Sequence, residues 1–120
     1  MRLLWVEDHA TFVHVAGRQF LSAHVVTVVA SLAEACRALA EHPFDAVLLD
    51  YDLPDGKGAS LIDLIRQLPQ RPAVVAVSSH DAGNRALLQA GADGTCPKGR
   101  FADIEAALAR AAARPRPADV

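Results

Sequence analysis

Five side chains that could do chemistry stand at the ends of short apolar runs in this 120-residue chain. Glu7 and Asp8 follow the first run, Asp50 follows the third, Ser78 follows the fourth, and Lys98 follows the fifth. If these runs are parallel strands of one sheet, their carboxyl ends meet at one edge, where open α/β sheets bind ligands. The sequence therefore predicts three carboxylates, a hydroxyl and an ammonium group at that edge.

Three clustered carboxylates repel one another, so their protonation is coupled and their ionised forms are costly without a cation. Mg²⁺ prefers oxygen ligands and would relieve this repulsion. A carboxylate left partly free by the metal could attack phosphorus and form an acyl phosphate. The metal and Lys98 would then neutralise the phosphoryl oxygens, and the hydroxyl of Ser78 would hold one of them.

The expected strands are apolar runs with abrupt polar ends: residues 3–6, 25–29, 46–49, 73–77 and a weaker fifth at 94–97. Continuous apolar runs of this length are typical of parallel strands covered on both faces. Helical stripes of apolar residues alternate with them: Val13/Ala16/Phe20, Leu32/Ala35/Leu39, Leu61/Ile65/Leu68 and Phe101/Ile104/Leu108. This alternation predicts an α/β fold, a doubly wound five-stranded parallel sheet with helices on both faces.

Local signals mark the ends of some helices. Ser31 and Glu34 are spaced as a capping box before the second helix. Asp81 can cap a short fourth helix that runs to position 90, and Gly91 is placed to end it.

Length, composition and charge exclude several classes of protein. The 120 residues fit one domain, and 52% hydrophobic with 22% charged residues lies outside the disordered range. A net charge of −2 means that the chain has no excess of positive charge to attract a nucleic-acid backbone. No apolar run approaches the ~20 residues that span a bilayer, and Glu7 and Asp8 interrupt any signal-peptide core. We expect a cytoplasmic protein with Cys36 and Cys96 as reduced thiols.

Four stretches together resemble the receiver domain of bacterial two-component response regulators. They are Leu3–Asp8, Val47–Gly58, Val75–Ser78 and Gly91–Gly94, the last followed by Lys98, in the order and spacing of that family. The resemblance covers residues 1–112 and leaves residues 113–120 as a linker or disordered tail. It implies a flavodoxin-like sheet with strand order 2-1-3-4-5.

The resemblance implies a phosphorylation switch rather than an enzyme. Asp50 would take a phosphoryl group from phosphohistidine on a sensor histidine kinase or a histidine phosphotransfer protein. Lys98 would bind the phosphoryl group, Ser78 would sense it, and slow hydrolysis would reset the switch. The downstream partner would be a protein or an output domain outside this chain, with no direct binding of nucleic acid or membrane.

The same resemblance implies a Mg²⁺ site. Asp8 would bind the ion directly together with Asp50, and Glu7 largely through water. The backbone carbonyl of Asp52 would supply another ligand. Taken alone, an acidic pair after a strand is more often a helix cap, and Asp52 and Asp55 are more often turn formers.

An alternative is a haloacid-dehalogenase-type phosphatase. In that family an Asp-x-Asp motif after an apolar strand, here Asp50 and Asp52, supplies a nucleophile and a general acid. Against this, Leu53 and Pro54 follow where Thr or Val is usual, the pair stands on the third strand, and the chain is short for that fold. Catalytic turnover of a small phosphate ester would identify the phosphatase.

Three positions depart from the receiver pattern. Gly99 follows Lys98 where the family usually has proline, Thr95 replaces an aromatic residue on the fifth strand, and Ser79 stands where alanine is common. Threonine has no ring to swing inward and is stiff at χ1. We therefore expect the signal to pass through the loop after the fourth strand, including Ser79 and His80.

The chain has five histidines, and two of them adjoin the predicted site. His9 follows the acidic pair and His80 follows the candidate switch region, so each is a candidate to line the pocket and tune hydrolysis. His14, His24 and His42 are expected at the surface. None of the five shows metal-ligand spacing.

Overall fold

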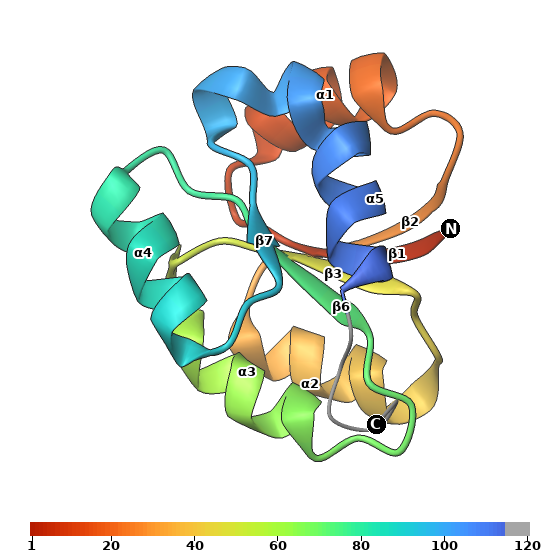
Figure 1. The fold of residues 1–120 in the computed structure, drawn as a ribbon, viewed down its shortest axis with the longest axis vertical. Coiled ribbons are helices and arrows are strands. Elements are labelled where there is room, and N and C mark those ends of the chain that lie inside the picture. The colour runs from red at the N-terminus through yellow and green to blue at the C-terminus, as the bar shows by residue number, and fades with distance from the viewer. Residues whose placement is uncertain (115–120) are drawn as a thin grey trace.

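The computed structural model describes residues 1–114 and confirms the predicted α/β fold (Figure 1). Five parallel strands form the main sheet: β1 (Arg2–Val6), β2 (Val25–Val29), β3 (Ala46–Leu49), β6 (Ala73–Ala76) and β7 (Gly94–Thr95). Their order is β2-β1-β3-β6-β7, which is the order 2-1-3-4-5 that the resemblance implies. Most of the expected linker, residues 115–120, lies outside the described residues.

Helices cover both faces of the sheet, as predicted. They are α1 (Ala10–Phe20), α2 (Leu32–Glu41), α3 (Ala59–Arg66), α4 (Asp81–Ala90) and α5 (Ile104–Ala113). A 3₁₀ segment, η1 (Lys98–Asp103), leads into α5. α1 and α5 pack on one face of the sheet, and α2, α3 and α4 pack on the other (Figure 1).

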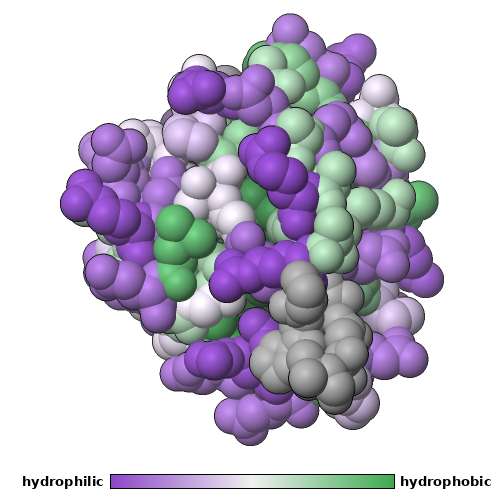
Figure 2. Space-filling model, in the orientation of Figure 1, coloured by the Kyte–Doolittle hydropathy of each residue, from purple (hydrophilic) through white to green (hydrophobic). Residues whose placement is uncertain are grey.

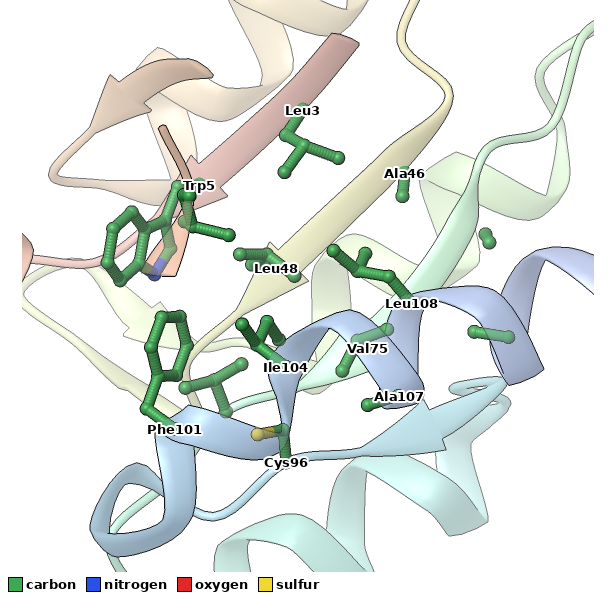
Figure 3. Packing of buried hydrophobic residues seen from close by; sticks show 14 of the residues in the cluster. Leu3, Trp5, Ala46, Leu48, Val75, Cys96, Phe101, Ile104, Ala107 and Leu108 are labelled. Atoms are coloured by element: carbon green, nitrogen blue, oxygen red, sulfur yellow. The ribbon is translucent and has the colours of Figure 1, made fainter. Parts of the chain in front are cut away.

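The layer under α1 and α5 contains an aromatic cluster (Figure 3). Trp5 of β1 stacks on Phe101 of η1 with ring centroids 5.3 Å apart, and Phe12 of α1 meets both rings edge-on. Trp5 is 1% exposed and so lies in the core. Because Phe101 lies three residues after Lys98, this cluster fixes the segment that carries the lysine.

The central strands are buried on both faces, but β2 is not. Each residue of Ala46–Leu49 is 0% exposed, because alternate side chains of this strand enter the two layers. On β2, by contrast, Val25 is 67% exposed and Val28 is 44% exposed. The expectation that all five runs are covered on both faces is therefore wrong for β2, because it is an edge strand with incomplete helical cover.

The Ser31 half of the capping box before α2 is confirmed, although Glu34 Oε2 accepts from the Ala30 N–H at 3.2 Å rather than from the Ser31 N–H. Ser31 Oγ accepts a hydrogen bond from the Glu34 backbone N–H at 3.2 Å. The predicted cap of α4 is wrong. Asp81 is already the first residue of α4, and the preceding His80 makes no side-chain capping bond. A carboxylate in the first turn favours the helix through its dipole rather than as a cap. Gly91 ends α4 with φ at 121°, as predicted.

A short antiparallel hairpin follows β3. Its strands are β4 (Asp52–Leu53) and β5 (Gly56–Lys57). The Asp55 carboxylate at its tip accepts hydrogen bonds from the backbone N–H groups of Leu32 and Ala33, at 2.8 and 3.0 Å. Asp55 is therefore in the turn, as predicted, and it also ties the loop after β3 to the N-terminus of α2.

The face that shows α4, β7 and α5 is mostly hydrophilic, with small and separate apolar areas (Figure 2). The exposed large apolar residues of the described chain include Leu88 of α4, at 42%. Scattered exposed apolar residues of this kind are normal for a globular domain. In residues 1–114, no helix has the length and apolar character that crossing a membrane requires.

Candidate functional site

Three carboxylates meet at the carboxyl edge of the sheet, as the sequence predicts. Glu7 and Asp8 directly follow β1, and Asp50 directly follows β3. The two strands are neighbours in register, with Val6 opposite Leu49, so the residues that come next are also side by side. One oxygen atom from each of the three carboxylates lies within 4.8 Å of the others.

The sheet ladder continues into these acidic residues and holds their backbone. The Glu7 N–H donates to the Val29 carbonyl at 2.9 Å, and the Asp50 N–H donates to the Val6 carbonyl at 3.1 Å. The residue as a whole is 2% exposed for Glu7 and 7% exposed for Asp50, while Asp8 is exposed. Two of the three charges are thus buried, and the third faces solvent.

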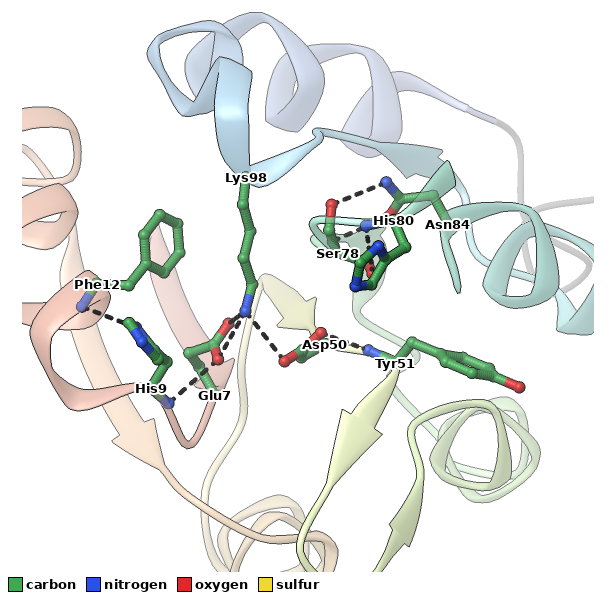
Figure 4. Close-up of polar contacts among 9 residues, drawn as sticks. All are labelled: Glu7, His9, Phe12, Asp50, Tyr51, Ser78, His80, Asn84 and Lys98. Carbon is green, nitrogen blue, oxygen red and sulfur yellow. Dashed lines mark hydrogen bonds and ion pairs between the residues drawn. The ribbon is translucent and has the colours of Figure 1, made fainter. Parts of the chain in front are cut away.

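Lys98 is the cation of the site (Figure 4). Its Nζ donates to Glu7 Oε2 at 2.9 Å and to Asp50 Oδ2 at 3.1 Å. The same atom lies 5.3 Å from the centroid of the Phe12 ring, which favours the charged form by a cation–π contact. Burial alone would lower the pKa of Lys98, but the hydrogen bonds and charges of Glu7 and Asp50 together raise it. The lysine is therefore held in its protonated form.

One ammonium group does not balance three carboxylates. Burial, and then the Asp50 charge, raise the pKa of Glu7 to about 7, although Lys98 acts to lower it. Glu7 Oε1 is buried and makes no hydrogen bond, although Lys98 Nζ lies 2.9 Å away. This oxygen, paired only with the Lys98 ammonium group, lies beside two further carboxylates, and such a cluster of carboxylate oxygens fits a hard divalent cation.

Ser78 lies at the same edge of the sheet, after β6, and is 4% exposed. Its Oγ accepts a hydrogen bond from the His80 N–H at 3.2 Å. Among the hydrogen bonds of the described residues, none joins this hydroxyl to Asp50. The link to the acidic residues runs instead through Lys98, whose N–H donates to the Ser78 carbonyl at 3.2 Å.

The Asp52 carboxylate does not join the other three. It is exposed and forms an ion pair with Lys57 across the β4–β5 hairpin. Lys57 in turn lies 5.0 Å from the centroid of the Tyr51 ring. The predicted role of Asp52 concerns its backbone carbonyl and stays a prediction.

His9 adjoins the site, as expected. Its N–H donates to Glu7 Oε2 at 3.2 Å, and its Nδ1 accepts from the Phe12 N–H at 3.3 Å, which caps α1. With Phe12, Ser79 and Lys98 it lines a cavity of about 220 Å³. Its effect on hydrolysis stays a prediction.

His14 and His42 are exposed, as expected, whereas His80 and His24 differ from their expectations. The side chain of His80 is exposed, and the cavity lining that includes His9 does not include it. His24 was expected at the surface, but its side chain is only 8% exposed because it contacts Glu105 of α5. Position in the sequence could not reveal that contact, which joins residues 81 positions apart.

Asn84 belongs to the site but was missed by the sequence analysis. It lies in the first turn of α4 and is 6% exposed. Its side-chain amide makes two hydrogen bonds to the backbone of Ser78. The available signal was its spacing: Asn84 and Leu87 stand three apart on the inward side of α4, where an apolar residue is the usual choice.

Comparison with known proteins decides the family. The family model described as "Response regulator receiver domain" matches residues 3–109. The chain belongs to this family. It is also 39% identical over 83 residues to the transcriptional regulatory protein KdpE of Mycobacterium tuberculosis, strain H37Rv. That alignment covers 68% of this chain and 37% of KdpE, so the chain matches well under two thirds of that relative's length.

Solved structures of receiver domains are similar to this one. One is the receiver domain of the sensor histidine kinase PA1611 from Pseudomonas aeruginosa PAO1, with a magnesium ion coordinated in its active-site cleft. It is 26% identical with a TM-score of 0.79, covering 94% of this chain and 98% of that one. Another is a response regulator from Burkholderia pseudomallei with a phosphorylated aspartic acid, a calcium ion and citrate. It is 22% identical with a TM-score of 0.77, covering 89% and 65%.

Family membership establishes the class of function. The chain is a receiver domain of two-component signalling, a phosphorylation switch rather than a catalytic enzyme, and histidine kinases are the partners of such domains. The receiver prediction is thereby confirmed over the haloacid-dehalogenase alternative. Glu7, Asp8 and Asp50 form an acidic cluster that could hold one metal ion, and the Pseudomonas receiver domain has a magnesium ion coordinated in its active-site cleft.

Proposed function

We propose that Asp50 accepts a phosphoryl group, in a Mg²⁺-dependent reaction, from a sensor histidine kinase or a histidine phosphotransfer protein. The observation that carries this proposal is the position of the Asp50 carboxylate. It is buried at the end of a central strand, its Oδ2 is 3.1 Å from Lys98 Nζ, and two further carboxylates are within reach of one ion.

The metal site would be built from both acidic strand ends. Asp8 and Asp50 would bind Mg²⁺ directly, Glu7 largely through water, and the Asp52 carbonyl would add a ligand. The clustering of one oxygen from each of Glu7, Asp8 and Asp50 within 4.8 Å of one another supports this assignment. So does the magnesium ion in the active-site cleft of the Pseudomonas receiver domain. When bound, the cation would neutralise charge on the phosphoryl oxygens.

The protein's own groups would position the reaction. Asp50 Oδ1 accepts from the Tyr51 N–H at 2.8 Å, which orients the carboxylate and leaves Oδ2 toward Lys98. As the new P–O bond to Asp50 forms, the P–N bond of phosphohistidine would break, and the leaving imidazole nitrogen would keep the electron pair and be protonated from solvent. The Lys98 ammonium group would then bind the negatively charged phosphoryl group, and Ser78 Oγ would rotate to bind one of its oxygens. Water would later hydrolyse the acyl phosphate to inorganic phosphate.

The same proposal includes the cellular location, the domain bounds and the downstream partner. The domain would act in the cytoplasm, with residues 1–112 as the receiver and 113–120 as a linker; the last helix ends at Ala113. Its phosphorylation would change binding to a downstream protein or to an output domain outside this chain. The net charge of −2 argues against direct nucleic-acid binding by the domain itself.

Intact-mass analysis tests the acceptor. Acetyl phosphate with Mg²⁺ is expected to add one phosphate to the wild type and none to Asp50→Asn, and chelation of Mg²⁺ is expected to abolish the addition. Asp63→Asn, at an exposed carboxylate of α3, is the matched control and should be phosphorylated normally. Labelling that persists in Asp50→Asn would refute the assignment.

A further inference from the structure

The side chain of Asn84 holds the backbone of Ser78 by two hydrogen bonds. Its Oδ1 accepts from the Ser78 N–H at 3.0 Å, and its Nδ2 donates to the Ser78 carbonyl at 3.1 Å (Figure 4). Both residues are buried, at 6% and 4% exposed. Buried amide bonds of this kind are costly to break, because each lost partner leaves a polar atom away from water.

The backbone of Ser78 is therefore fixed at both of its polar atoms. Its carbonyl accepts a second hydrogen bond, from the Lys98 N–H at 3.2 Å. The hydroxyl is held less firmly, by the single bond from the His80 N–H at 3.2 Å. The group free to move is thus the hydroxyl, by rotation about χ1, and the peptide units on either side of it stay in place.

Gly83, which has no Cβ, leaves space for the Ser78 hydroxyl beside α4. A Cβ at position 83 would lie 2.6 Å from Ser78 Oγ and 3.0 Å from Tyr51 Cβ. The first turn of α4 therefore contacts Ser78 twice, through the Asn84 amide and through the open side of Gly83. In this arrangement the Ser78 hydroxyl lies against α4 and is not bonded to Asp50.

We propose that Asn84 is a positioning residue for phosphoryl binding, which fixes the Ser78 backbone so that the hydroxyl alone turns from α4 toward the phosphoryl group. This inference rests on the proposed function of Asp50. In this proposal the first turn of α4 holds Ser78 at the distance from the phosphoryl group that its hydroxyl needs. It also predicts that the effect of Asn84 is exerted through the Ser78 hydroxyl.

The experiment is a double-mutant cycle on residues 78 and 84, with beryllofluoride and Mg²⁺ as the probe of the phosphorylated state. Affinity is measured by titration of Trp5 fluorescence in the wild type, Asn84→Ala, Ser78→Ala and the double variant. Leu87→Ala is the matched control. Leu87 is a fully buried residue of the same helix, packed in the layer with α2 and α3. Thermal unfolding is recorded for every variant.

Asn84→Ala is expected to weaken beryllofluoride binding about fivefold or more, as does Ser78→Ala, with little further loss in the double variant. Leu87→Ala is expected to lose at least as much thermal stability, with beryllofluoride affinity within about twofold of the wild type. An additive double variant, or an Asn84→Ala affinity equal to that of the wild type, would overturn the proposal. Failure of the wild type to bind beryllofluoride would instead overturn the proposed function of Asp50.

Asn84→Asp keeps the test decisive if the alanine variant does not fold. It has the same shape and keeps the acceptor for the Ser78 N–H, but it loses the donor to the Ser78 carbonyl. An affinity between those of the wild type and Ser78→Ala is expected. A wild-type affinity would contradict the two-bond arrangement. Loss of the fold in both Asn84 variants, with a folded Leu87→Ala, would assign Asn84 a purely structural role.

Discussion

Glu7 and Asp50 on one side of the site, and Ser78 on the other, all follow parallel strands, but different bonds hold them. The sheet ladder runs on into the two acidic residues, whose N–H groups donate to carbonyls of β2 and β1. Beyond β6, the Val77 N–H still donates to the Leu49 carbonyl, and the Ser78 carbonyl still accepts from the Lys98 N–H. The next N–H, that of Ser78, donates to the side chain of Asn84.

This difference separates a rigid part of the site, formed by Glu7 and Asp50, from an adjustable part, formed by Ser78 at the junction of β6 with α4. A ladder bond depends on backbone alone, so a carboxylate can be replaced without loss of its neighbours' positions. The Ser78 N–H, by contrast, is held by one side chain of one helix, and the Ser78 hydroxyl faces that helix. A switch needs an element with two arrangements whose balance the ligand changes, and the junction of β6 with α4 is built in this way.

The largest effect on the rigid part should come from loss of its cation. Lys98→Met leaves two buried carboxylates without their partner, and we expect a loss of roughly 2 kcal/mol in unfolding free energy. Saturating Mg²⁺ should restore part of this loss, because the metal supplies the missing charge. Lys57→Met, at a lysine whose side chain is 60% exposed, is the control and should change stability little. Urea unfolding with and without Mg²⁺ measures both; equal losses in the two lysine variants would refute the prediction.

A smaller and opposite effect is expected at Asp8. Asp8→Asn removes one of three like charges, so the metal-free protein should gain on the order of 1 kcal/mol of stability. Its affinity for Mg²⁺ should fall about tenfold, because a direct ligand is lost. Trp5 fluorescence during Mg²⁺ titration and urea unfolding in EDTA measure the two quantities. A less stable metal-free variant that binds Mg²⁺ normally would contradict the arrangement.

Asp55 supports the rigid part from outside, through the loop after β3. Hydrogen bonds from the Leu32 and Ala33 N–H groups lower the pKa of this carboxyl. A lowered folded-state pKa contributes stability above the unfolded value of 3.8, and this is lost as pH falls through the folded value. Asp55→Ala should therefore be less stable than the wild type near neutral pH, with the difference closing in strong acid. Urea midpoints from pH 7 to pH 2 measure it; a difference that grows in acid would be the wrong sign.

The smallest expected effect locates the adjustable part without any mutation. Beryllofluoride should shift backbone amide resonances of Ser78–Asn84 more than those of Thr95 and residues 100–107. The reason is that Thr95, half-buried in β7 and paired with Ala76, has no ring to move inward. Two-dimensional amide spectra with and without beryllofluoride measure the shifts. Equal or larger shifts on β7 and α5 would place the adjustable element there.

Local patterns were enough to predict the features that depend on neighbours in the chain. The Ser31 cap of α2 and the Gly91 helix end were both correct, since each involves residues within one or two turns. The ends of the first and third strands, Val6 and Leu49, were correct as well, because an apolar run that meets an acid must stop at the edge of the core. The fourth and fifth strands end earlier than predicted, at Ala76 and Thr95 instead of 77 and 97. Parallel strands then bring Glu7 and Asp50 together without further information.

Only the tertiary structure decided what the site residues bond to. The Asp55 cap on α2, the burial of His24 and the Asn84 bonds to Ser78 depend on how loops and helices pack. The cover over β2 was wrongly predicted for the same reason, since an apolar run does not say whether a strand lies at an edge. The sequence determined which groups reach the carboxyl edge, because hydrophobic burial sets strand positions. The fold decided which of them hold one another, because hydrogen bonds form only between atoms that packing has already brought within about 3 Å.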